Sequence, residues 1–364
     1  CKPMDTLARN SLMILSDRQT WTDADGKSRP AVRWLLDVMT ASLSGKPVAH
    51  GHPVFRIEND QLLSMLGLPE RPGFRYTLDE LTPKLDMVQR HAERASEREA
   101  GQRDLVDTKV LELYGQLRLW MSLAHFEEPH AIPPAKDGEE WRRFSAAAQN
   151  EQASGAQDGD ARAFGTLLLA WAEHKPELFN AELAKYAAEL DRRMPDVTSK
   201  ARFEVFFNRL EPFYRCAVLY MVALLLVCVG WLGWTATLHK TAFRLLALTL
   251  AVHTFALVAR MVLQDRPPVT NLYSSAIFIG WGCALGGLAL ERVYRLGVGS
   301  FLAASLGFGT MVIAHNLSGS GDTMEMMQAV LDTNFWLATH VTTVTLGYTA
   351  TFVAGFLGAI YVLM

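Results

Sequence analysis

Residues 216–237 read CAVLYMVALLLVCVGWLGWTAT and contain no charged side chain. An α-helix needs about 20 apolar residues to cross the hydrocarbon core of a membrane, so this stretch predicts a transmembrane helix. Similar apolar stretches follow, and together they predict five transmembrane segments, at about 216–237, 245–264, 272–290, 297–315 and 336–364. We therefore expect a mostly α-helical chain with a polytopic membrane domain.

The part that precedes these segments has a different composition. The chain of 364 residues has 35 Lys+Arg and 38 Asp+Glu, but residues 216–364 hold only 6 of the basic and 5 of the acidic residues. This asymmetry predicts a soluble domain, residues 1–210, followed by a membrane domain, residues 216–364. The last residues form an apolar run without a polar flank, so we expect the membrane domain to be incomplete at its C-terminus. The net charge of −3, without a basic patch, argues against a nucleic-acid partner.

The soluble domain is predicted to be mainly helical, with a small, polar, linker-like segment at 145–162. No catalytic triad, phosphate loop or paired-carboxylate signature stands out in it. His50 and His52 have a spacing that metal sites use, but no Cys or carboxylate cluster completes one, so turn histidines are the favoured interpretation. This domain is interpreted as a binding or scaffolding domain whose ligand the sequence does not reveal.

The four cysteines exclude two classes of protein. No Cys-x-x-Cys pair, zinc-ligand spacing or Cys-x-x-Cys-His haem-attachment motif is present among Cys1, Cys216, Cys228 and Cys283. A c-type cytochrome and a thiol oxidoreductase are therefore disfavoured.

The orientation of the membrane domain follows from the basic residues near the segment ends. Four of them flank the connections after the first and third segments: Lys240, Arg244, Arg292 and Arg295. Only Arg260 and Arg266 flank the connection after the second segment, although Arg209 and Arg215 favour the opposite orientation. We expect the soluble domain, and the connections after the second and fourth segments, to face outward.

Two features of the membrane segments point to helix packing or to ligand binding. Small residues recur every fourth position in the last segment, at Gly347, Thr351, Gly355 and Ala359, and predict a close-packing face. Three histidines, His253, His315 and His340, lie in or at the ends of segments, where ionisable groups are costly. They are either structural hydrogen-bonding groups or ligands of haem iron or another metal. His340 is the strongest candidate because Trp336, four residues earlier, shares its helical face.

Two stretches resemble a known family. Residues 266–282, RPPVTNLYSSAIFIGWG, resemble the Pro-x-x-Asn-Leu-Tyr-Glu-Ser segment of CcsA/ResC-type cytochrome c biogenesis proteins, through Pro268, Asn271, Leu272 and Tyr273. Residues 335–348, FWLATHVTTVTLGY, resemble the same family's Trp-Leu-x-x-His-Val helix. Ser274 departs from the pattern, because the family usually has Glu there.

The resemblance implies haem handling on the outer face of a membrane. It implies that this is the bacterial inner (cytoplasmic) membrane, with residues 1–210 extracytoplasmic. It implies that His340 is an axial ligand of the iron of haem b, which is presented as a substrate to apocytochrome c within a cytochrome c synthase system. ResB/CcsB-like subunits are the implied partners. The family's Trp-rich WWD segment and second external histidine should follow the last helix, so we expect them in a longer protein.

Two alternatives remain open. A non-haem transporter would use His253 and Arg260 to line a solute pathway. A membrane-anchored scaffold would bind a partner protein through residues 1–210.

Overall fold

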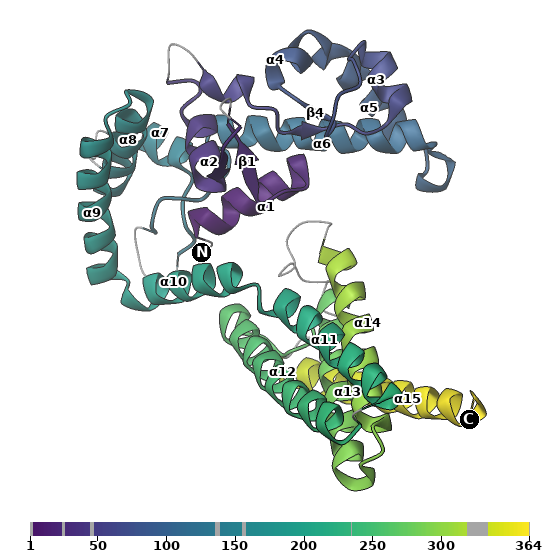
Figure 1. Cartoon of the computed structure of the whole chain (residues 1–364). Coiled ribbons are helices and arrows are strands. Elements are labelled where there is room, and N and C mark those ends of the chain that lie inside the picture. The colour runs from purple at the N-terminus through teal and green to yellow at the C-terminus, as the bar shows by residue number, and fades with distance from the viewer. Residues whose placement is uncertain are drawn as a thin grey trace. The chain divides into compact units, whose positions relative to one another are not determined.

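The computed structural model describes residues 3–23, 26–43, 47–134, 139–154, 158–233, 235–318 and 334–363. It confirms the mostly helical fold and divides the chain into two compact units, Cys1–Arg202 and Phe203–Met364 (Figure 1). The division falls a few residues before the boundary expected at 210–216, because helix α10, Pro195–Leu210, runs through it. Each unit has its own hydrophobic core.

Among its described residues, the first unit is built from helices and two small two-stranded antiparallel sheets. The strands are β1 (Thr20–Thr22) paired antiparallel with β2 (Ser28–Pro30), and β3 (Phe55–Arg56) paired antiparallel with β4 (Arg75–Tyr76). The helices before the polar segment are α1 (Met4–Ser16), α2 (Ala31–Met39), α3 (Asp60–Leu66), α4 (Leu78–Leu81), α5 (Leu85–Glu97) and α6 (Leu105–Ala124). Trp34, Phe55 and Tyr76 are completely buried at the centre of this unit.

The prediction of a linker-like segment at 145–162 is wrong, because most of it is helical. Residues 144–154 form helix α7, Phe144–Ser154, and Gly159 already begins helix α8, Gly159–Ala172, while 155–157 lie outside the described residues. Its alanines and glutamines are good helix formers, and the side chain of Asp158 caps α8 by accepting from the backbone N–H of Ala161. The next helix is α9 (Pro176–Arg193).

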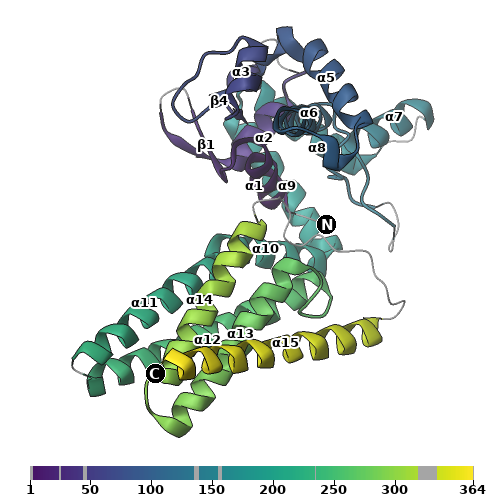
Figure 2. The same ribbon diagram turned by 90° about the vertical axis from the view of Figure 1, so that its right-hand side faces the viewer.

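The second unit contains the five predicted segments as α11 (Pro212–Leu232), α12 (Thr235–Gln264), α13 (Leu272–Tyr294), α14 (Val298–Ser318) and α15 (Asn334–Leu363). Within the described ranges, five helices are long and apolar enough to cross a membrane. The chain is therefore an integral membrane protein. Figure 2 shows these helices gathered into one bundle. The connection expected at 238–244 is helical, because α12 already begins at Thr235.

Glycines bring the backbones of α13 and α14 together. A Cβ on Gly299 would lie 2.4 Å from the carbonyl oxygen of Gly287, so only glycine fits this crossing. The same pair is joined by the buried carboxylate of Glu291, which accepts hydrogen bonds from the backbone N–H groups of Gly297 (3.0 Å) and Ser300 (3.1 Å). Glu291 on α13 thus caps the start of α14.

The prediction that the last helix packs through its small-residue series, at Gly347, Thr351, Gly355 and Ala359, is wrong. Helix α15 buries Thr345 and Thr349, and a Cβ on Gly282 of α13 would lie 2.7 Å from Thr349 Cγ2. By contrast, no described atom lies within 4 Å of a Cβ placed on Gly347 or Gly355. Three members of the small-residue series line an open apolar groove instead: Thr351, Gly355 and Ala359. The threonines pack because they face α13, which a four-residue repeat alone does not reveal.

Candidate functional site

One end of the membrane unit gathers most of the candidate residues. The start of α11 meets the end of α14, where the Tyr214 and His315 rings are 6.5 Å apart, and it meets the start of α13, where Phe213 lies 6.3 Å from Tyr273. At the other end, Phe301 near the start of α14 lies 5.8 Å from Phe356 in the second half of α15. The start of α15 therefore lies at the same end of the bundle as the end of α14.

The Pro268–Tyr273 motif forms the start of α13. Asn271 Oδ1 accepts a hydrogen bond from the Ser274 N–H (2.8 Å), and Ser274 Oγ accepts from the backbone N–H groups of Asn271 and Thr270 (both 2.8 Å). This reciprocal capping box commonly has Glu or Gln at the position of Ser274. Ser274 therefore keeps the capping role in spite of its departure from the family pattern. Leu272 is 65% exposed.

Tyr273 holds a buried cation. The guanidinium carbon of Arg260, on α12, lies 4.9 Å from the centre of the Tyr273 ring, and Arg260 is only 2% exposed. An arginine at this depth is costly unless it is paired, and the aromatic face supplies one favourable contact. Tyr273 and Arg260 thus join α12 to α13 beside the motif.

His253 is enclosed in the interior of the same unit. It is completely buried, and its Nδ1 lies 3.1 Å from the hydroxyl oxygen of Tyr220 on α11. The Phe213 ring stands edge-on to the imidazole at 5.9 Å. Nε2 has no hydrogen-bond partner within the part of the chain that the structure describes. These contacts match the structural alternative, a histidine that joins neighbouring helices.

His340 and Trp336 have the opposite environment. Both side chains are exposed on α15, with Trp336 63% exposed, and they lie one helical turn apart. His315 is also exposed, near the end of α14. The three candidate histidines thus have different surroundings: one is packed in the interior, one lies beside Tyr214, and His340 follows an exposed indole.

Metal binding by a cluster is not indicated. Across the described ranges, no group of three or more His, Cys, Asp or Glu side chains could hold a metal ion. In the first unit, His52 contacts Asp37 (3.1 Å) whereas His50 lies 3.6 Å from Asp79, so the two histidines face different carboxylates. A haem iron differs from such sites because it needs only one or two axial side chains.

Two further residues were not singled out from the sequence. His239 lies in α12, within the connection expected at 238–244, and both its ring nitrogens are buried without a hydrogen-bond partner among the described residues. A Cβ on Gly297 would lie 2.3 Å from His239 Cε1, so the α13–α14 loop closes directly over the imidazole. Glu291 is the second residue. It directly follows the apolar segment predicted at 272–290 and precedes Arg292, so the sequence marks it only as a charged residue at a segment end.

Sequence comparison shows which known proteins the chain is similar to. No family model matches it. It is 24% identical to Protein NrfI of Wolinella succinogenes over 98% of its own length and 39% of that protein. It is 31% identical to Cytochrome c biogenesis protein CcsA of Prochlorococcus marinus (strain NATL2A) over 109 residues, 29% of this chain and 33% of that protein. The CcsA of Synechococcus sp. (strain CC9311) is 28% identical over 145 residues, 38% of this chain and 47% of that protein. The chain is a relative of the CcsA-type proteins.

This relationship agrees with the resemblance found in the sequence. The similarity to NrfI covers nearly the whole chain, so it includes the first unit as well as the membrane helices. The chain spans between about a third and a half of the length of these three relatives.

Proposed function

We propose that this chain is part of a membrane component of cytochrome c maturation that binds haem b and presents it on the outer membrane face to apocytochrome c. The observation that carries the proposal is the exposed imidazole of His340, one turn after the exposed indole of Trp336. A neutral imidazole is a good axial ligand for haem iron, and an indole offers a flat apolar face on which a porphyrin can stack.

The packing of α15 supports this role. At about 100° per residue, Thr345 and Thr349 lie about 140° and 180° around the helix from His340. These two threonines are the buried ones, so α15 packs on its neighbours through the side that faces away from His340. The imidazole therefore points away from the neighbouring helices and stays accessible. Such access suits a ligand that must release its haem.

The basic residues support the outward placement of His340. Lys240 and Arg244 lie in the first turns of α12, and Arg292 and Arg295 lie at the end of α13, at the end of the bundle opposite the start of α15. By the positive-inside rule, this basic end faces the cytoplasm, and His340 then faces the other side of the membrane. A bacterial inner membrane with an extracytoplasmic soluble unit is part of the proposal.

In this proposal, the bound haem reacts with two thiols of apocytochrome c. Each cysteine S–H adds across a vinyl C=C group, with sulfur bonding to one carbon and hydrogen to the other, so no oxidant is consumed. Holding the iron by axial imidazoles leaves the vinyl groups exposed for this step. His340 supplies one axial ligand, and the second is expected elsewhere in a longer protein or in a ResB/CcsB-like partner.

The transporter alternative has less support. His253 is held by Tyr220 and packed against Phe213, and Arg260 is buried against Tyr273, as expected for side chains that join helices. A scaffold role for the soluble unit is compatible with haem delivery and would act beside it.

The test is the absorption spectrum of the complete protein that contains this chain, purified in detergent. We expect His340→Ala to lose most of the Soret absorbance of bound haem, and added imidazole to restore it by replacing the missing ligand. His315→Ala is the matched control, because it removes another exposed histidine from the same end of the bundle. An unchanged Soret band in His340→Ala, or wild-type protein without haem, would overturn the proposal.

A further inference from the structure

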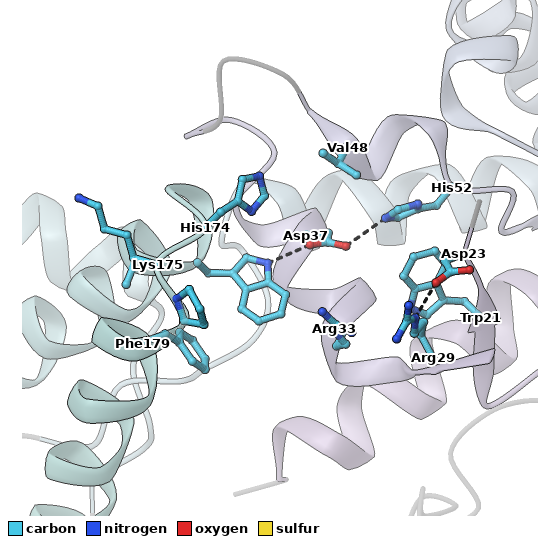
Figure 3. Close-up of a pocket in the computed structure, with 13 residues that line it drawn as sticks. Trp21, Asp23, Arg29, Arg33, Asp37, Val48, His52, His174, Lys175 and Phe179 are labelled. Carbon is cyan, nitrogen blue, oxygen red and sulfur yellow. Dashed lines mark hydrogen bonds and ion pairs between the residues drawn. The ribbon is translucent and has the colours of Figure 1, made fainter. Parts of the chain in front are cut away.

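The first unit contains a cavity that has no part in the proposed haem site. It has a volume of about 410 Å³ and is lined by α2, by the β1–β2 hairpin and by the corner between α8 and α9 (Figure 3). Trp21, Trp171 and Phe179 supply its aromatic lining, and Arg33, Asp37 and His52 are among its polar residues. This volume lies in the range of about 300–1,000 Å³ that is typical of small-molecule sites.

One carboxylate fixes both tryptophans. Asp37 Oδ1 accepts a hydrogen bond from Trp171 Nε1 (2.8 Å), across 134 residues of sequence, and Asp37 Oδ2 lies 3.1 Å from His52 Nε2. The His52 ring in turn lies 4.1 Å from the Trp21 ring. The two indoles are thus held in place before any ligand arrives, which lowers the entropic cost of binding.

The charge left available in the cavity is positive. Asp37 is engaged by Trp171 and His52, and the Asp23 carboxylate pairs with Arg29 at 2.5 Å. Arg33 is exposed between these groups (Figure 3), and its guanidinium carbon lies 5.9 Å from the centre of the Trp171 ring. In the described part of the chain, no carboxylate lies within ion-pair distance of Arg33.

We propose that this cavity binds a small organic anion with a flat aromatic body. The aromatic body packs against the two indoles, and the anionic group pairs with Arg33, whose planar guanidinium matches a carboxylate through two parallel hydrogen bonds. The fixed tryptophans select a flat ligand, and Arg33 selects its charge. Binding here is independent of His340.

The test measures binding of 5-fluoroindole-3-acetate to the full chain in lipid nanodiscs by fluorine NMR. Its neutral amide, 5-fluoroindole-3-acetamide, has the same ring without the charge. We expect the wild type to bind the acid at least about 10-fold more tightly than the amide, which corresponds to about 1.4 kcal/mol. Arg33→Gln should abolish this preference, whereas Arg90→Gln, which removes an exposed arginine from α5, should keep it.

A second variant tests the aromatic wall. Trp171→Ala should weaken binding of the acid and of the amide alike, because both use the ring, and His340→Ala should change neither. The proposal is overturned if the wild type binds neither compound at low-millimolar concentration. Equal affinity for acid and amide would overturn it as well, as would a preference that survives in Arg33→Gln.

Discussion

The carboxylate of Glu291 makes a measurable contribution to the start of α14. It is 8% exposed and accepts two backbone hydrogen bonds, from Gly297 at 3.0 Å and from Ser300 at 3.1 Å. In Glu291→Gln, the side chain keeps one carbonyl acceptor but turns an NH₂ group toward the second N–H. One buried donor then has no acceptor, at a cost of about 1–3 kcal/mol, and the favourable charge at a helix N-terminus, worth about 0.3–1 kcal/mol, is lost.

Together these terms predict that Glu291→Gln weakens the first turn of α14 by about 2–3 kcal/mol. Since about 1.4 kcal/mol is a factor of ten, amide hydrogen exchange at residues 297–301 should become about 30- to 140-fold faster. The measurement is hydrogen–deuterium exchange with mass spectrometry, on the chain in nanodiscs.

The control is Arg292→Gln, which changes the neighbouring, exposed side chain and should alter exchange by less than about twofold. Exchange at 297–301 that stays at the wild-type rate in Glu291→Gln would refute the cap. Equal acceleration in the Arg292 control would refute its specificity.

Two other predictions concern packing and pH. Gly287→Ala should destabilise the membrane unit by about 1–3 kcal/mol, because the new Cβ would lie 2.7 Å from the carbonyl oxygen of Gly299. The SDS concentration at which this unit unfolds should fall accordingly. Gly286→Ala, whose Cβ would have no atom closer than 3.8 Å, should be tolerated, and equal losses in both would contradict the close approach. In the first unit, burial raises the pKa of Asp158, but hydrogen bonds from Arg142 and from backbone N–H groups outweigh it and hold the pKa below its usual value. The resulting stabilisation is complete above about pH 4 and is lost as the pH falls further, so Asp158→Asn should flatten this part of an acid-unfolding curve; an unchanged curve would argue against the ion pair.

Much of the membrane unit follows from local sequence. Helix α11, Pro212–Leu232, forms because its uncharged apolar run must satisfy its backbone hydrogen bonds internally in lipid. The start of α13 was also predictable to within its first residue, because Asn271 is a good N-cap directly before an apolar run. The prediction for residues 145–162 was wrong because small polar residues are compatible with either a loop or a helix. Packing against neighbouring helices decides between the two.

The sequence by itself determined that the chain is helical, that a charge-rich part precedes a membrane part, and that it resembles the CcsA-type proteins. Length, hydropathy and short motifs carry this information, because they act within a few residues of one another. Only the tertiary structure decided that α15 packs through Thr345 and Thr349, and that Asp37 joins Trp171 to His52. Such contacts depend on which helix faces meet, and this is settled by the packing of side chains that are distant in the sequence.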